Sequence, residues 1–156
     1  METLDAFDRA ILQQLQADGR LTNAELAQRV GLSAAPCWRR VRALEAAGFI
    51  LGYRAEVDRH KIGLGVLAFV RLDAVQINGA ELRQLEDAIR AVPEIVSCHY
   101  ISGAGTFELQ VVGRDLEQFS RFAREVLIQL PNVKDIHTSF SLGEVKAAGA
   151  LPIGLR

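Results

Sequence analysis

Residues Ser33–Gly48 have the sequence SAAPCWRRVRALEAAG, which decides the fold of the first third of the chain. Ser33 is a favourable N-cap, Pro36 falls in the first turn, and Gly48 can take the left-handed conformation that ends a helix. The stretch therefore predicts one helix. At 100° per residue, the helix has an apolar and a basic face. The apolar stripe comprises Cys37, Val41 and Leu44, and the nearly opposite face comprises Ala35, Arg39, Arg42 and Ala46.

The basic face contains no acidic residue. From Gly31 to Leu44 the chain carries three arginines and no aspartate or glutamate. Solvated helix faces usually mix charges of both signs, and the small alanines of the first turn leave room for a close approach. We interpret the face as a DNA contact; an ordinary solvated face is the alternative.

The preceding segment strengthens this interpretation. Thr22 and Glu25 have the spacing of a capping box, and Gly31 ends the short apolar pattern that follows. Two short helices joined by a tight turn, the second of them basic, are typical of a helix-turn-helix, whose recognition helix enters the major groove. A generic pair of packed core helices is the alternative.

The flanking segments complete a three-helix, winged-type unit over residues 1–57. A first helix begins near Asp5 and ends at Gly19. Residues 49–57 alternate enough to predict a strand, on which Arg54 either reaches a phosphate as a wing does or is simply exposed. The candidate DNA-binding residues are Thr22, Ser33, Ala34, Ala35, Trp38, Arg39, Arg40, Arg42 and Arg54.

Charge is distributed unevenly along the 156 residues. The formal net charge is −1, so the whole molecule has no global attraction for nucleic acid. Arg20 to Leu44, however, contains five arginines and one glutamate, a local charge of +4. Any DNA site must therefore come from this cluster.

The two cysteines, Cys37 and Cys98, have no Cys-x-x-Cys spacing. We therefore expect two buried thiols, with neither a disulfide framework nor a zinc site. No signal-peptide pattern and no 18-residue apolar run occur, so we expect a cytoplasmic protein without membrane contact. We expect no cofactor and no metal.

The second half predicts a βαββαβ order. Residues 58–65 are polar with two glycines and are expected to link two domains. Periodicity then predicts a ferredoxin-like domain over residues 66–142, so the whole chain has an α+β fold, and residues 143–156 form a C-terminal tail. The expected strands are 66–75, 95–102, 106–113 and 133–142, and the expected helices are 79–91 and 116–130.

One face of this sheet is expected to lack helices. In the third strand, Phe107, Leu109 and Val111 can face the helices, whereas Thr106, Glu108, Gln110 and Val112 face away. The half-polar open face and the edge strands that begin after Pro93 and Pro131 suggest a partner subunit.

These residues together closely resemble the Lrp/AsnC family of leucine- and asparagine-responsive regulators over nearly the whole chain. The resemblance implies a DNA-binding helix-turn-helix domain and a ferredoxin-like domain that assembles the protein and senses a small molecule, commonly an amino acid. It also implies double-stranded DNA as a partner and dimers that associate further, often to octamers. The matching segments are Leu4–Leu12, Asp18–Thr22, Gly31–Ser33, Pro36–Val41, Leu44-Glu45, Gly48–Ile50, Tyr53–Ala55, Ile62–Gly65, Pro93-Glu94, the helix near Leu127, His137–Phe140 and Glu144–Lys146.

The chain departs from the family pattern in one loop. Family members typically have Thr-Gly-Asp-Tyr-Asp-Tyr-Leu-Leu where this chain has Ser102–Leu109, so Ala104 and Thr106 replace two acids. The resemblance implies that this loop helps to bind the effector, and an acid suits an ammonium group. Glu108 either substitutes for the lost acids or is a solvated strand residue. The implied effector-binding residues are Gly103, Ala104, Gly105, Thr106, Glu108, Ser139, Phe140 and Ser141.

Other functional classes fit the sequence less well. His99 and His137 have no companions in the sequence that form a metal-ligand set or a catalytic triad, so we expect hydrogen-bonded strand histidines and no catalytic residue. Sirohaem decarboxylases resemble the family in both domains, but an enzyme has no reason to keep Arg39 and Arg42 opposite an apolar stripe. A ligand-binding module without DNA binding is the third alternative.

Overall fold

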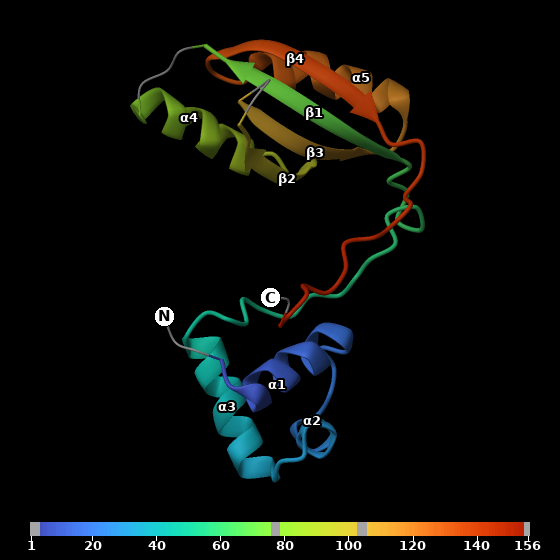
Figure 1. Cartoon of the computed structure of the whole chain (residues 1–156). Helices are drawn as coiled ribbons and strands as arrows, with labels where there is room; N and C mark the ends of the chain where they lie inside the picture. The colour runs from blue at the N-terminus through green and yellow to red at the C-terminus, as the bar shows by residue number, and fades with distance from the viewer. Residues whose placement is uncertain (1–3, 76–78, 103–105, 155–156) are drawn as a thin grey trace. The chain divides into compact units, whose positions relative to one another are not determined.

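The computed structural model describes residues 4–75, 79–102 and 106–154. Two compact units result, one formed by Met1–Glu56 together with Lys146–Arg156 and the other by Val57–Val145. We call them the N-terminal and C-terminal units and describe each separately (Figure 1). The expected tail, residues 143–156, is thus divided between the two units. The expected effector residues Gly103, Ala104 and Gly105 lie outside the described residues.

The N-terminal unit contains three helices. They are α1 (Ala6–Ala17), α2 (Asn23–Val30) and α3 (Ala34–Ala46). Each helix contributes side chains to one small core, because the apolar stripe of each amphipathic helix requires burial. The most deeply buried members are Ile11, Leu26, Ala27, Cys37 and Leu44.

Side chains and glycines fix the turn between α2 and α3. Thr22 and Glu25 form the predicted capping box, in which the Glu25 N–H donates to Thr22 Oγ1 and the Thr22 N–H donates to Glu25 Oε2. Gly31 follows with a φ of 72°, which costs a glycine little. Ser33 occupies the N-cap of α3 but its side chain makes no capping hydrogen bond. Asn23 instead donates to the Ala34 carbonyl at 2.9 Å and so joins the two helices.

The strand expected over residues 49–57 is not formed. These residues adopt no regular strand, although Gly48 ends α3 with the predicted left-handed conformation, at a φ of 75°. A strand needs a neighbouring backbone to satisfy its N–H and C=O groups, and none of the described strands pairs with this segment. Arg54 is accordingly exposed on an irregular segment rather than on a wing.

The C-terminal segment packs against α1. The Gln16 side chain donates to the Leu151 carbonyl at 3.2 Å and accepts from the Leu151 N–H at 2.6 Å. Gln13 donates to the Ile153 carbonyl at 3.3 Å, and the Ile153 side chain packs on the helical core. Both ends of the chain therefore belong to the same unit (Figure 1).

The C-terminal unit has the predicted ferredoxin-like fold. Its antiparallel sheet has the strand order β2-β3-β1-β4, so β2 and β4 form the two edges, as predicted (Figure 1). The strands are β1 (Val66–Ala74), β2 (Ile95–Tyr100), β3 (Phe107–Gly113) and β4 (Val133–Phe140), and the helices are α4 (Gly79–Arg90), α5 (Leu116–Glu125) and the 3₁₀ helix η1 (Leu127–Gln129).

Three boundaries differ from the predictions by more than one residue. The helix expected to run through Leu130 ends at Glu125 and is followed by η1. Pro131 disfavours the α conformation at Leu130, which has a ψ of 139°, so a helix cannot continue through that residue. β2 and β4 also end two residues before the expected Ser102 and Leu142.

The core of this unit lies between one face of the sheet and the two helices. Alternate residues of β3 are buried, so Phe107, Leu109 and Val111 face the helices, as predicted. Leu85 of α4 and Phe119 of α5 pack against this face. The opposite face, which we call the open face, carries the remaining residues of each strand. Within the described ranges, no helix is long and apolar enough to cross a membrane.

Candidate nucleic-acid interface

The two faces of α3 differ in burial as predicted. Cys37 and Leu44 are buried in the core, and burial raises the pKa of the Cys37 thiol, which keeps it protonated. Cys98 of β2, also expected to be buried, is instead exposed, because it lies on an edge strand. The exposed residues of α3 and its N-cap that were proposed to contact DNA are Ser33, Ala34, Ala35, Trp38, Arg39 and Arg42.

Arg40 is attached to the rest of the N-terminal unit. Its Nη1 lies 2.8 Å from both Asp5 Oδ2 and Asp8 Oδ1, and its guanidinium lies over the Phe7 ring at 5.4 Å from the centroid. The hydrogen bonds to Asp8 and Asp5 raise the pKa of Arg40. The Asp8 N–H, followed by Arg40, lowers the pKa of the Asp5 carboxyl. Arg40 therefore has two acidic partners within the chain, which distinguishes it from the other arginines of α3.

Arg42 makes one exposed contact. Its Nη1 lies 2.9 Å from Glu45 Oε2, three residues further along the helix, and its side chain is 65% exposed. The Tyr53 hydroxyl donates to the other Glu45 oxygen, and burial, followed by the Glu45 charge, raises the pKa of Tyr53. Exposed pairs of this kind contribute little to stability, so Arg42 can exchange Glu45 for another anion.

Arg39 is exposed and makes no ion pair or hydrogen bond with another described residue. Next to it in the chain, Trp38 is 56% exposed, so the indole is not part of the helical core. Arg39 and Trp38 therefore present a charged and an aromatic group to solvent, a combination that suits contact with a polyanion.

Thr22 has a structural role. Its hydroxyl donates to Glu25 Oε2 at 2.7 Å and also accepts from the Glu25 N–H. The hydrogen bonds from the Thr22 hydroxyl and then from its N–H lower the pKa of Glu25. The Thr22 side chain therefore orients α2 and is only secondarily available to a phosphate.

The expected effector residues that the structure describes do not converge within one chain. The Thr106 N–H donates to the Leu72 carbonyl, whereas the Ser141 N–H donates to the Leu67 carbonyl. Leu67 and Leu72 are five positions apart on β1, or about 17 Å. Thr106 and Ser141 therefore lie at opposite ends of this strand.

The remaining effector candidates lie on both sides of the sheet. Glu108 is on the open face, where its carboxylate lies 3.8 Å from Arg71 Nη2. Phe140 instead packs edge-on against Phe119 of α5, with ring centroids 5.1 Å apart, and so faces the helices. Ser139 pairs in register with Phe69 on the open side. These described residues therefore do not line one pocket within a single chain.

Two family models match the chain and cover both units. Residues 4–50 match the winged helix-turn-helix DNA-binding family, and residues 67–151 match the Lrp/AsnC ligand-binding domain. The leucine-responsive regulatory protein of Escherichia coli K12 is 39% identical over 153 residues, covering 98% of this chain and 93% of the relative. The chain belongs to the Lrp/AsnC family. It is a DNA-binding transcriptional regulator with a ligand-binding domain.

Solved structures of other Lrp/AsnC regulators are similar over almost their full length. A transcriptional regulator of Neisseria meningitidis, in complex with L-Met, has a TM-score of 0.92 and 38% identity, covering 97% of this chain and 98% of that one. An AsnC family regulator of Agrobacterium tumefaciens has a TM-score of 0.90 and 31% identity, covering 96% and 97%. The family is one of transcriptional regulators, so the enzyme alternative receives no support.

Proposed function

We propose that the exposed face of α3 is the recognition surface of this regulator, with Arg39 and Arg42 contacting DNA. The observation that supports this most strongly is the exposed guanidinium of Arg39, which has no partner among the described residues and lies on a helix whose opposite face is buried. Ala34 and Ala35 precede it in the first turn, where small side chains permit a close approach to base edges or a thymine methyl group. Arg40 holds α3 against α1 through Asp5 and Asp8.

Substitution of the two arginines tests this assignment. Arg39→Ala or Arg42→Ala should weaken specific binding by about 1–3 kcal/mol if the residue contacts a base. This corresponds to a roughly 5- to 150-fold higher Kd in fluorescence anisotropy with an operator obtained by selection from genomic DNA. Arg121→Ala on α5 is the matched control and should bind normally. Unchanged affinity in both α3 variants contradicts the assignment.

We also propose that the C-terminal unit forms a homodimer through the open face. Phe69 of β1 is 36% exposed there, and Leu67 and Val112 lie on the same side of the sheet. A three-helix unit occupies one half-site, so a dimer would bind two half-sites about one helical turn, or a multiple of it, apart. Higher assemblies such as octamers would then join these dimers.

Light scattering at micromolar concentration tests the dimer. The full chain should have at least twice the protomer mass, and Phe69→Glu should convert it to a monomer, because a buried unpaired carboxylate is costly. The control is Leu116→Glu, which adds a charge at an exposed apolar residue of α5, and it should remain dimeric. A monomeric wild-type protein excludes the proposal.

The third part of the proposal concerns the effector. We infer that Thr106 and Glu108 of one chain and Ser139, Phe140 and Ser141 of another line a pocket for an amino acid or a related metabolite, and that the protein regulates the corresponding metabolism. The N. meningitidis relative in complex with L-Met supports this ligand class. Gly103, Ala104 and Gly105 are proposed to complete the pocket. We also propose that the protein is cytoplasmic.

The loss of two loop acids should weaken the binding of ordinary amino acids. A poorly compensated ammonium group in a partly buried pocket costs several kcal/mol per ion. Glu108, two residues after Thr106, could replace the lost loop acids, but it already pairs with Arg71. Calorimetry against the twenty amino acids should therefore detect weak binding at most, or binding that Glu108→Gln abolishes and Glu117→Gln does not. A tight ligand that Glu108→Gln still binds overturns this inference.

A further inference from the structure

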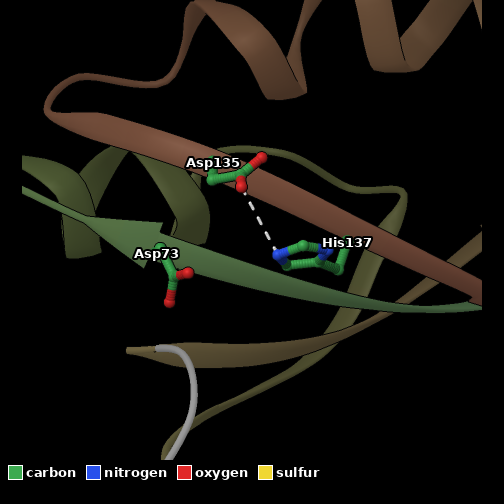
Figure 2. Close-up of side chains that lie close together, drawn as sticks. All are labelled: Asp73, Asp135 and His137. Carbon is green, nitrogen blue, oxygen red and sulfur yellow. Dashed lines mark ion pairs between the residues drawn. The ribbon is translucent and has the colours of Figure 1, made fainter.

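Three potential metal ligands meet on the open face, where β1 pairs with β4. Asp73 and Asp135 are directly opposite each other in the antiparallel register, and His137 follows Asp135 by two residues. Leu72 precedes Asp73, and Ile136 lies between Asp135 and His137; both pack in the core. Because side chains alternate along a strand, all three polar groups project from the open face. Figure 2 shows Asp135 and His137 on β4 and Asp73 on the adjacent β1.

Their spacing suits a small metal ion. One ligand atom from each residue lies within 4.8 Å of the other two. His137 Nε2 lies 3.4 Å from Asp135 Oδ2. Two ligands at about 2.0–2.1 Å from a tetrahedral zinc ion lie about 3.3–3.4 Å apart, so this pair already has the required separation.

The backbone orients one of these carboxylates. Asp135 Oδ1 accepts the Ile136 N–H at 2.8 Å, which leaves Oδ2 directed toward His137 (Figure 2). A second group that fixes the ligand in this way is a common feature of metal sites.

The charges around the cluster also favour a cation. Two carboxylates directly opposite each other on neighbouring strands repel. Among the described residues, no lysine or arginine forms an ion pair with Asp73 or Asp135. The nearest basic residue in register is Arg71, opposite His137, and its guanidinium is turned to Glu108 on β3. A divalent ion would neutralise both carboxylates.

We propose that Asp73, Asp135 and His137 bind one divalent transition-metal ion of the zinc class. The imidazole nitrogen favours such an ion over magnesium or calcium, which prefer oxygen ligands. Three protein ligands leave a coordination position for water or for a donor from another molecule. The ion would join β1 to β4 across the edge of the sheet.

Calorimetry with ZnCl₂ on the chelator-treated full chain tests the site. Wild type should bind one Zn²⁺ per chain, and His137→Gln and Asp73→Asn should each weaken binding by at least about tenfold, because loss of a ligand costs no less than loss of the group that orients it. His99→Gln is the matched control. It removes a second open-face histidine, whose Nε2 lies 3.1 Å from Ser97 Oγ, and should bind as wild type does.

A spectroscopic measurement keeps the test independent of stability. Co²⁺ added to the apo protein should give visible d–d absorption in wild type and His99→Gln, and this absorption should be lost in His137→Gln. Asp73→Asn is isosteric and removes a like-charge contact, so we expect that variant to fold. The proposal is overturned if wild type binds no stoichiometric Zn²⁺, or if His137→Gln and Asp73→Asn bind it as tightly as wild type does.

Discussion

At the residue scale, the three arginines of α3 differ in the number of acidic side chains with which they form ion pairs. Arg40 has two aspartates at 2.8 Å, Arg42 has one exposed glutamate, and Arg39 has no partner among the described residues. A charge that is already paired gains less from a phosphate, because the first contact must be broken. Arg39 is therefore the most available of the three for DNA, and Arg40 the most important for holding α3 in place.

Arg40→Ala should lower Tm, whereas Arg39→Ala should leave it nearly unchanged. The first substitution leaves Asp5 and Asp8 without their common cation, and the second removes no contact of a described residue. Thermal melts followed by circular dichroism at pH 7 measure both. Equal melting temperatures for wild type and Arg40→Ala would show that these ion pairs contribute nothing to the N-terminal unit.

Glu25 should make the N-terminal unit sensitive to acid. Thr22 lowers the folded-state pKa of Glu25 below its ordinary 4.5, so the contribution is present above pH 4.5 and is lost as pH falls through the folded-state pKa. The Tm difference between wild type and Glu25→Gln should be present at pH 7 and should shrink as the pH falls below 4.5. A difference that stays the same at every pH below 4.5 contradicts a role for the ionised carboxylate.

At the element scale, the turn between α2 and α3 sets the direction in which α3 leaves α2. Gly31 has a φ of 72°, and a Cβ atom at this position would meet nothing within 4 Å, so the constraint is conformational rather than steric. The same left-handed conformation at Gly48 ends α3. The C-terminal ends of α2 and α3 therefore each depend on a residue without a Cβ atom.

Gly31→Ala should lower the free energy of unfolding by about 1–2 kcal/mol, the cost of the left-handed conformation for a residue with a side chain. Gly143→Ala is the control, because its φ lies outside the left-handed region and its surroundings are open. This control should change stability by less than about 0.5 kcal/mol. Urea denaturation measures both, and equal stability of the two variants contradicts the conformational argument.

Elements with local signals could be predicted from the sequence, and elements that depend on distant partners could not. The Thr22–Glu25 capping box and the Gly31 stop mark the two ends of one helix, and α2 has the expected bounds. Residues 49–57 show the alternation of a strand, but no strand within the described ranges lies beside them.

The candidate sites follow the same rule. The buried and exposed faces of α3 followed from helical periodicity, whereas the acidic partners of Arg40 lie on a different helix and could not be assigned individually. The Asp73, Asp135 and His137 cluster could not be predicted, because the register between β1 and β4 joins residues far apart in the sequence. The spacing of these three residues along the sequence does not indicate that they lie close together. The roles of Gly103, Ala104 and Gly105 remain predictions.

At the scale of the whole molecule, the C-terminal segment of the chain packs on α1 of the N-terminal unit. Three hydrogen bonds tie Gln13 and Gln16 of α1 to Leu151 and Ile153. Residues 146–156 thus contribute to the same unit as α3, although residues 146–151 lie within the match to the Lrp/AsnC ligand-binding domain.

Gln16→Ala should therefore loosen the C-terminal segment. The Leu151 amide donates to Gln16 Oε1, so its hydrogen exchange should accelerate in this variant while the amides of β1 remain protected. Gln28→Ala, an exposed glutamine of α2, is the control and should leave the Leu151 amide unchanged. Equal exchange of this amide in wild type and Gln16→Ala contradicts the contact.

The most direct test of the DNA-binding surface is a mobility-shift titration of the full chain with its operator over a series of salt concentrations. The logarithm of Kd should rise linearly with the logarithm of the salt concentration, because arginines displace condensed counterions from phosphates. The double variant Arg39→Ala/Arg42→Ala should bind more weakly and with a shallower slope than wild type or Arg121→Ala. An affinity that does not depend on salt, or a double variant with the wild-type affinity and slope, would contradict the role of this helix face.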